Sequence, residues 1–98
     1  MEPTPDQQSL HAFVEGHVQG VGFRYYVKET AERLALTGWV RNRLDGSVEV
    51  MAQGDRAHLQ NLLDSIQIGP SRSIVTHVQA DWGTPENHYS QFSFLPTE

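Results

Sequence analysis

The chain has 98 residues, of which 38% are hydrophobic, 19% are charged and none is cysteine, and its formal net charge is −5. This length predicts one domain, and the lack of cysteine excludes a disulfide framework, a thiol nucleophile and thiolate metal sites. The negative charge argues against nucleic acid or an anionic membrane surface as a partner, and no apolar run approaches the roughly 20 residues of a membrane helix.

The first nine residues predict a disordered N-terminal tail. Residues 1–9 are mostly polar, include two prolines, and contain neither the basic region nor the apolar stretch of a secretory signal. We therefore expect one domain over residues 10–98. Cytoplasmic localisation follows as the default, and a monomer is the simplest oligomeric state.

The first half of the domain predicts a strand, a helix and a hairpin. Residues 10–15 alternate as a strand, with Phe13 on one face and, on the other, Leu10, Ala12 and Val14. Apolar residues then recur at helical spacing over residues 23–34, and Gly38 is expected to end this segment. Residues 39–43 and 47–53 predict two antiparallel strands, because the Asp-Gly pair between them is a strong hairpin signal.

The second half predicts one more helix and one or two strands. Asp55 is expected to cap a helix that ends at Gly69-Pro70 and whose apolar stripe comprises Leu59, Leu62, Leu63 and Ile66. Residues 73–81 predict a strand, residues 83–88 a loop, and residues 92–95 a short edge strand.

The order β-α-β-β-α-β, with a short extra edge strand, predicts an α+β ferredoxin-like sandwich. In this architecture two helices cover one face of an antiparallel sheet. The fold by itself indicates no function, because enzymes, RNA-binding modules and metal carriers all use it.

Residues 16–24, Gly-His-Val-Gln-Gly-Val-Gly-Phe-Arg, are the most informative stretch. Glycine permits positive φ, so several main-chain N–H groups can converge on one point. A helix that begins near Gly22 adds unpaired N–H groups and the positive end of its dipole, and Arg24 adds a guanidinium that matches two phosphate oxygens. The stretch predicts a site for a small phosphate dianion, although a tight turn followed by a solvated arginine explains the same residues. Its glycine spacing fits neither a Walker loop nor a dinucleotide motif.

Asn42 is the second candidate site residue. It shares a face of its strand with Val40, while Trp39, Arg41 and Arg43 share the other face. Taken alone, an asparagine near a turn is expected to satisfy a main-chain group. Arg41 and Arg43 are expected to be solvated strand charges.

Two blocks of the chain resemble the acylphosphatase family. Residues 16–24 are similar to the family's Gly-x-Val-Gln-Gly-Val-x-Phe-Arg, and residues 38–48 to its Gly-x-Val-x-Asn-x-x-Asp-Gly-x-Val. The blocks follow the family's order and approximate spacing, and the similarity extends from about Leu10 to Leu95. The resemblance also implies the ferredoxin-like fold.

This resemblance implies an enzyme that hydrolyses small acyl phosphates to a carboxylate and inorganic phosphate. It implies that Arg24 binds the phosphoryl group, that Asn42 holds the attacking water, and that neither a metal ion nor a cofactor is needed. An amide suits the second role because it both donates and accepts hydrogen bonds. The implied phosphate-binding loop comprises Gly16, His17, Val18, Gln19, Gly20, Val21, Gly22, Phe23 and Arg24.

The histidines are expected at the surface or in turns, because no close ligand pair occurs among His11, His17, His58, His77 and His88. His17 is the exception of interest, since a protonated imidazole inside the loop would modestly strengthen phosphate binding. The alternative to an enzyme is a non-catalytic ferredoxin-like module that binds an anion or a partner chain. Asn42 separates the two, because phosphate capture alone has no use for an amide that orients water. An RNA-binding module is disfavoured by the negative charge.

Overall fold

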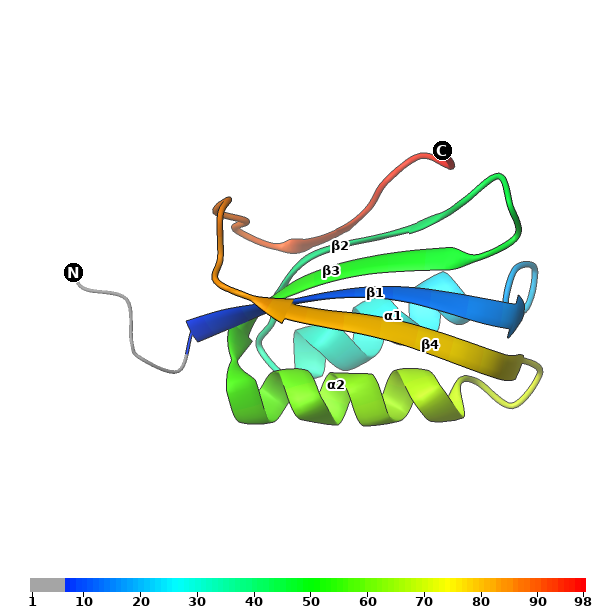
Figure 1. Ribbon diagram of the computed structural model, residues 1–98, viewed down its shortest axis with the longest axis horizontal. Helices are drawn as coiled ribbons and strands as arrows, with labels where there is room; N and C mark the ends of the chain where they lie inside the picture. Colours follow the sequence, from blue (N-terminus) through cyan, green and yellow to red (C-terminus); the bar gives the residue numbers. More distant parts are fainter. Residues whose placement is uncertain (1–6) are drawn as a thin grey trace.

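A computed structural model describes residues 7–98 (Figure 1). The expected tail over residues 1–6 lies outside the described residues. Within residues 7–98 the elements follow in the order β1 (Gln7–His17), α1 (Phe23–Arg33), β2 (Thr37–Asn42), β3 (Val48–Asp55), α2 (Arg56–Ile68), β4 (Ile74–Gly83) and β5 (Phe92–Phe94). The order of strands and helices agrees with the sequence prediction.

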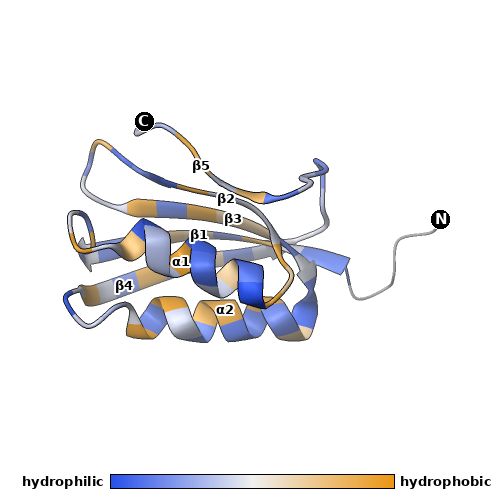
Figure 2. Ribbon diagram, turned by 180° about the vertical axis from the view of Figure 1, so that it is seen from behind, coloured by the Kyte–Doolittle hydropathy of each residue, from blue (hydrophilic) through white to orange (hydrophobic). Residues whose placement is uncertain are grey.

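The five strands form one sheet in the order β4-β1-β3-β2-β5. Both helices cover the same face of this sheet, and they lie side by side across it (Figure 2). Within residues 7–98 the other face carries no helix, and it is called the open face below. This is the predicted ferredoxin-like sandwich.

The extra edge strand differs from the predicted all-antiparallel sheet, because β5 pairs in parallel with β2. β1 pairs antiparallel with both β3 and β4, and β2 pairs antiparallel with β3, so β4 and β2 run in opposite directions. After β4 the chain crosses to the far edge of the sheet and reverses. Because of this reversal β5 runs parallel to β2. β5 also covers the edge of β2, so fewer of its main-chain groups are available for pairing with another chain.

β1 is longer at its N-terminal end than predicted. Residues 7–9, assigned to the tail from the sequence, belong to the strand, because Gln7 pairs with Asp55 and Ser9 with Gln53. The side chains of this extension are polar, so the sequence predicted a disordered tail. The main chain nevertheless pairs with β3.

The core lies between the sheet and the helices. β1 contributes the predicted alternating set, and each helix contributes its apolar stripe. Completely buried members include Leu10, Ala12, Val14, Val27, Val40, Val50, Leu59, Leu62 and Ile66. Burial of a Val or Leu side chain stabilises a fold by roughly 1.5–3 kcal/mol, so the helices are held mainly by this interface.

Gly38 does not end α1, contrary to the prediction. The helix ends at Arg33 with Leu34 as its cap, and Ala35 then takes a positive φ of 58°. Gly38 lies inside β2 at a φ of 140°, where a Cβ atom would come within 1.9 Å of the carbonyl oxygen of Met51. Glycine is required here because the neighbouring main chain is too close for any side chain.

The predicted hairpin is present between β2 and β3. Gly46 takes a φ of 94°, and the Arg43 amide donates to the Ser47 carbonyl at 2.9 Å. Asp45 Oδ1 accepts hydrogen bonds from the hydroxyl and the amide of Ser47, and these bonds hold the pKa of Asp45 below its usual value. The turn fixes where β2 ends, and therefore where Asn42 lies.

Replacement of Asp55 by alanine is expected to lower the free energy of unfolding by about 1 kcal/mol. Asp55 caps α2 as predicted, and its carboxylate accepts from the Ala57 amide at 2.8 Å. Urea denaturation measures the loss. Asp55→Asn is the control, because it keeps the accepting oxygen, and equal stability of Asp55→Ala and the wild type would contradict the capping role.

Candidate active site

The loop that the sequence predicts to bind phosphate is shorter than residues 16–24. Gly16 and His17 belong to β1, where they pair with Val75 and Ile74 beyond a register shift at Glu15/Gly16. Gly16 takes a φ of 126°, and a Cβ atom there would lie 2.0 Å from the Ile74 carbonyl oxygen. The ladder with β4 therefore extends through His17, whose side chain is exposed, and the loop proper covers residues 18–22.

Two buried side chains anchor the loop. Val18 and Phe23 each expose 1% of their surface and pack in the core. Gly20 and Gly22 between them take φ values of 74° and 78°, with open space where a Cβ would lie. Val21 packs partly against the core, so the glycines carry the exposed bends.

The main-chain amides of residues 19–24 are the candidate anion cradle. Within residues 7–98, the amides of residues 19–24 donate no hydrogen bond to a protein acceptor, and Gly22 caps α1 without a side-chain hydrogen bond. The first turn of α1 also contains no acidic residue. The positive end of the helix dipole is thus available to an anion, which such a terminus stabilises by about 0.3–1 kcal/mol.

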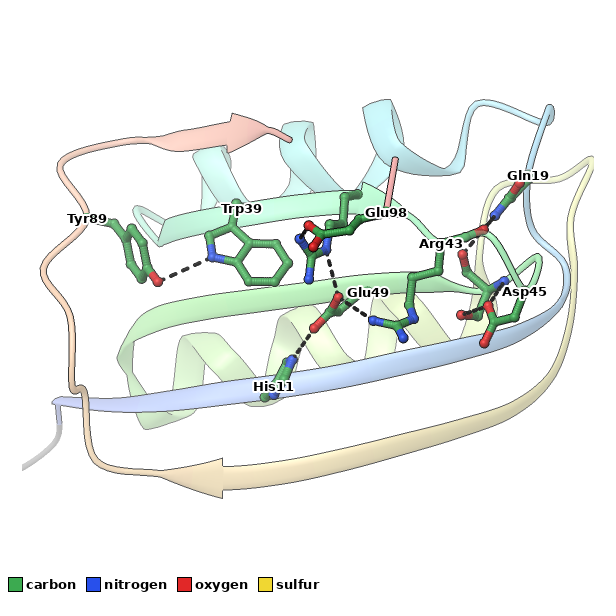
Figure 3. A network of polar contacts seen from close by, with 10 residues as sticks. His11, Gln19, Trp39, Arg43, Asp45, Glu49, Tyr89 and Glu98 are labelled. Atoms are coloured by element: carbon green, nitrogen blue, oxygen red, sulfur yellow. Dashed lines mark hydrogen bonds and ion pairs between the residues drawn. The ribbon is translucent and has the colours of Figure 1, made fainter. Parts of the chain in front are cut away.

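Gln19 ties the loop to the hairpin. Its side-chain amide donates to the carbonyl oxygens of Arg43 and Ser47, at 2.8 and 2.9 Å. The loop is consequently held beside the residue that follows Asn42 (Figure 3).

Arg24 is the second residue of α1 and is half-buried. Its guanidinium carbon lies 5.9 Å from the centroid of the Phe94 ring. Among the described residues it makes no ion pair, so its charge is not neutralised by a carboxylate. An unpaired guanidinium beside free amides is suited to hold an anion with two oxygens.

Asn42 is the last residue of β2 and shares the helix-covered face with Val40, as predicted. Its side-chain oxygen Oδ1 is buried and accepts no hydrogen bond within residues 7–98. A buried acceptor normally has a partner, and an unpartnered one costs about 1–3 kcal/mol. The sequence alone predicted that the Asn42 side chain bonds to a main-chain group. For the oxygen Oδ1 this prediction is wrong.

The contacts bring these elements to one end of the helix-covered face. Phe94, under the Arg24 guanidinium, pairs with Val40, which lies two residues from Asn42 on the same face. Gln19 reaches the residue after Asn42 from the other side. These contacts hold the loop and the start of α1 next to the end of β2 that carries Asn42.

A hollow of about 280 Å³ lies beside the loop but does not suit phosphate. It is lined by Glu15, Gly16, Asp45, Gly46 and Ser47. Its two carboxylates would repel a dianion, so an anion is favoured on the side of the loop that faces Arg24.

Arg41 and Arg43 are not solvated strand charges, contrary to the prediction. On the open face, Arg41 Nε and an Arg43 terminal nitrogen lie 2.8 and 3.0 Å from Oε1 of Glu49. His11 Nε2 lies 2.6 Å from the other oxygen, Oε2, and the His11 side chain is 34% exposed, so His11 is a partly exposed histidine of strand β1 and not a turn residue. The other four histidines are exposed, as expected.

Glu49 was missed from the sequence. The side chain exposes 5% of its surface, although it belongs to the face without helices. Burial raises the pKa of its carboxyl, but the hydrogen bonds from His11, Arg41 and Arg43 outweigh this, so the pKa lies below the usual value. The network stabilises the fold fully above the ordinary glutamate pKa, and this contribution is lost as the pH falls through the lowered one.

Comparison with known proteins identifies the family. The acylphosphatase family model matches residues 10–94. This chain belongs to the acylphosphatase family. Over 91 residues it is 44% identical to the acylphosphatase of Mycolicibacterium smegmatis, with 93% of each chain covered. The resemblance stated from the two motif blocks is confirmed.

Solved acylphosphatase structures have the same fold. The enzyme from Bacillus subtilis superposes with a TM-score of 0.87 at 36% identity, covering 90% of this chain and 98% of that one. The enzyme from Coxiella burnetii gives 0.86 at 38% identity, covering 92% and 94%. The chain is thus an acylphosphatase that acts on a small substrate, and a non-catalytic module is not favoured. Neither helix in residues 7–98 has the length and apolarity needed to cross a membrane.

Proposed function

We propose that the amides of the loop and Arg24 hold the phosphoryl group of a small acyl phosphate, and that Asn42 positions the water that attacks it. The observation that carries this proposal is the buried Oδ1 of Asn42, which accepts no hydrogen bond within residues 7–98 and belongs to the end of β2 that Gln19 ties to the loop before α1. A water molecule that donates to Oδ1 satisfies the buried acceptor and keeps a lone pair free for attack.

In the proposed reaction, the water oxygen bonds to phosphorus as the bond from phosphorus to the acyl oxygen breaks on the opposite side. The acyl group leaves as a carboxylate with the electron pair. The water keeps one proton as the new phosphate hydroxyl and passes the other to a phosphate oxygen or to solvent. A carboxylate is already a good leaving group, so no strong general acid is needed.

The charge to be stabilised lies on the three non-bridging phosphoryl oxygens. The amides of residues 19–24 and the Arg24 guanidinium are donors without protein acceptors among the described residues, so no protein bond is broken when they bind these oxygens. Preorganised donors of this kind supply much of the rate enhancement of enzymes. We therefore propose that catalysis needs no metal ion.

We also propose that the protein is a cytoplasmic monomer. No cysteine is present, so the fold requires no oxidising compartment. β5 covers the β2 edge of the sheet, which leaves fewer main-chain groups for pairing with a second copy. Light scattering should give a mass near 11.1 kDa.

The test of this function is the release of inorganic phosphate from acetyl phosphate and benzoyl phosphate in the presence of a chelator. We expect hydrolysis of both well above the spontaneous rate, and no loss of rate when the chelator is added. A simple phosphate monoester serves as the control substrate, because its poor leaving group should leave it almost unhydrolysed. A rate that vanished with the chelator and returned with a divalent cation would contradict the metal-free mechanism.

A further inference from the structure

The position of the Asn42 side chain depends on the main chain that carries it. Asn42 is the last residue of β2, and its pairing with Val48 closes the ladder before the exposed turn at residues 44–46. Strand ends next to turns open most easily. Because Oδ1 has no protein partner among the described residues, no hydrogen bond to that oxygen fixes its place.

The open face supplies a restraint at this point. The two chain neighbours of Asn42, Arg41 and Arg43, both direct their guanidinium groups to Oε1 of Glu49. Figure 3 labels Arg43 and Glu49 of this group. Successive side chains of a strand point to opposite faces, so these two flank the main chain of Asn42 from the face opposite its amide. Glu49 therefore holds the residues directly before and after Asn42 by hydrogen bonds.

Glu49 is itself held rigidly. Its second oxygen bonds to His11 of β1 at 2.6 Å, so the carboxylate joins three neighbouring strands. Arg41 lies over the Trp39 ring at 4.9 Å and Arg43 over the Phe13 ring at 5.3 Å. Stacking restricts both guanidinium groups to the orientation that meets the carboxylate.

The C-terminal segment adds a second restraint on the same main chain. The amide of Glu98 donates to the Asn42 carbonyl oxygen at 3.1 Å, and the Leu44 amide donates to the Glu98 carbonyl at 3.1 Å. The Glu98 carboxylate also pairs with Arg41. Residue 42 is thus fixed from the open face and from the edge of the sheet, while its amide faces the helices.

We infer that Glu49 is a positioning residue for catalysis: by holding Arg41 and Arg43 it fixes the main chain of Asn42 and so aims the Asn42 amide from the other face of the sheet. This inference rests on the proposed role of Asn42. Glu49 does not touch the anion cradle, so its loss should affect the alignment of water more than the binding of phosphate.

The test is Glu49→Gln, which keeps the shape of the side chain but replaces one acceptor oxygen with a donor. The amide oxygen can still accept from both arginines while the nitrogen faces His11, but the negative charge is lost, so each guanidinium is held by a weaker, neutral acceptor. We expect kcat to fall about 10- to 100-fold, since a small misalignment of reacting groups has this effect, while inhibition by inorganic phosphate changes less than about twofold. The NMR signals of the Asn42 side-chain amide should shift or broaden.

Asp55→Ala is the matched control for lost stability. It weakens the fold at the start of α2 without touching the network, and its kcat should equal that of the wild type when both variants are assayed well below their unfolding temperatures. If Glu49→Gln keeps the wild-type kcat and the Asn42 amide signals, the inference is overturned. It is also overturned if kcat and phosphate binding fall together by the same factor, because Glu49 would then act on the site as a whole.

Asn42→Ala in the same assay separates this inference from the proposed function. If Asn42→Ala keeps its turnover, the proposed water-positioning role fails, and the inference fails with it. If Asn42→Ala loses turnover while Glu49→Gln keeps it, only the positioning role of Glu49 fails.

Discussion

Arg24→Ala is expected to lower kcat/KM by roughly 10³-fold or more and to weaken inhibition by inorganic phosphate about 10- to 100-fold. Charge-assisted hydrogen bonds are each worth roughly 1.5–3 kcal/mol, and the guanidinium would make them both to the bound phosphate and to the transition state. Phosphate release and inhibition by inorganic phosphate measure the two effects separately.

The folded state should tolerate this substitution. Arg24 makes no ion pair among the described residues, so its removal leaves no carboxylate without a partner there. The cation–π contact with the Phe94 ring is lost, which is worth about 0.5–1 kcal/mol. A large loss of activity at nearly unchanged stability therefore assigns the effect to the site.

Arg24→Lys is the matched variant, because it keeps the charge but removes the planar pair of donors. We expect it to recover phosphate binding more than turnover, since a point charge attracts the dianion without fitting two oxygens. If Arg24→Ala bound phosphate as tightly as the wild type, the anion would lie elsewhere and the proposed site would be wrong.

The sequence predicted the elements of this fold because their signals are local. Alternation in β1, the two apolar helix stripes, the Asp45-Gly46 turn and the Asp55 cap each depend on residues within a few positions of one another. The two acylphosphatase blocks likewise lie within 33 residues, from 16 to 48. These features did not depend on knowing which strands are neighbours.

The missed features all depend on contacts between distant segments. The sequence predicted that Gly38 ends a helix. Position 38 requires glycine instead because the carbonyl oxygen of Met51 on β3 leaves no room for a side chain. Gly16 reads as part of a loop, but β4 extends the ladder past it. The parallel pairing of β5 similarly depends on where the chain goes after β4.

Glu49 is the instructive case, because half of its network was visible in the sequence. A hairpin centred on Asp45 places residue 41 opposite residue 49, and opposite charges at such positions attract. The burial of the carboxylate was not visible, since it requires His11 from β1, 38 positions away. The open face of the sheet therefore carries a buried carboxylate, that of Glu49. An alternation of buried and exposed strand residues does not predict it.

Asn42→Ala is expected to lower kcat by about 10²–10³-fold while inhibition by inorganic phosphate changes less than about threefold. The proposed role of this amide is toward the water and not toward the phosphoryl oxygens, which are assigned to Arg24 and the loop. A loss of kcat without a matching loss of phosphate binding is the result that this division of roles requires.

The stability of Asn42→Ala should not fall as it does when most buried polar side chains are removed. Because Oδ1 accepts no hydrogen bond within residues 7–98, its removal breaks no bond between that oxygen and another described residue, and only the bound water loses its acceptor. Asn42→Ala should therefore unfold at about the same urea concentration as the wild type. A loss of turnover without a loss of stability is typical of a group that acts in catalysis and not in the fold.

Asn42→Asp tests whether the oxygen alone is sufficient. A carboxylate accepts from water as the amide does, but its negative charge repels the phosphate dianion and the negative charge of the transition state. We expect Asn42→Asp to lose phosphate binding as well as turnover, in contrast to Asn42→Ala. If instead Asn42→Ala weakened phosphate binding and turnover equally, Asn42 would contact the phosphoryl group itself, and another group would have to orient the water.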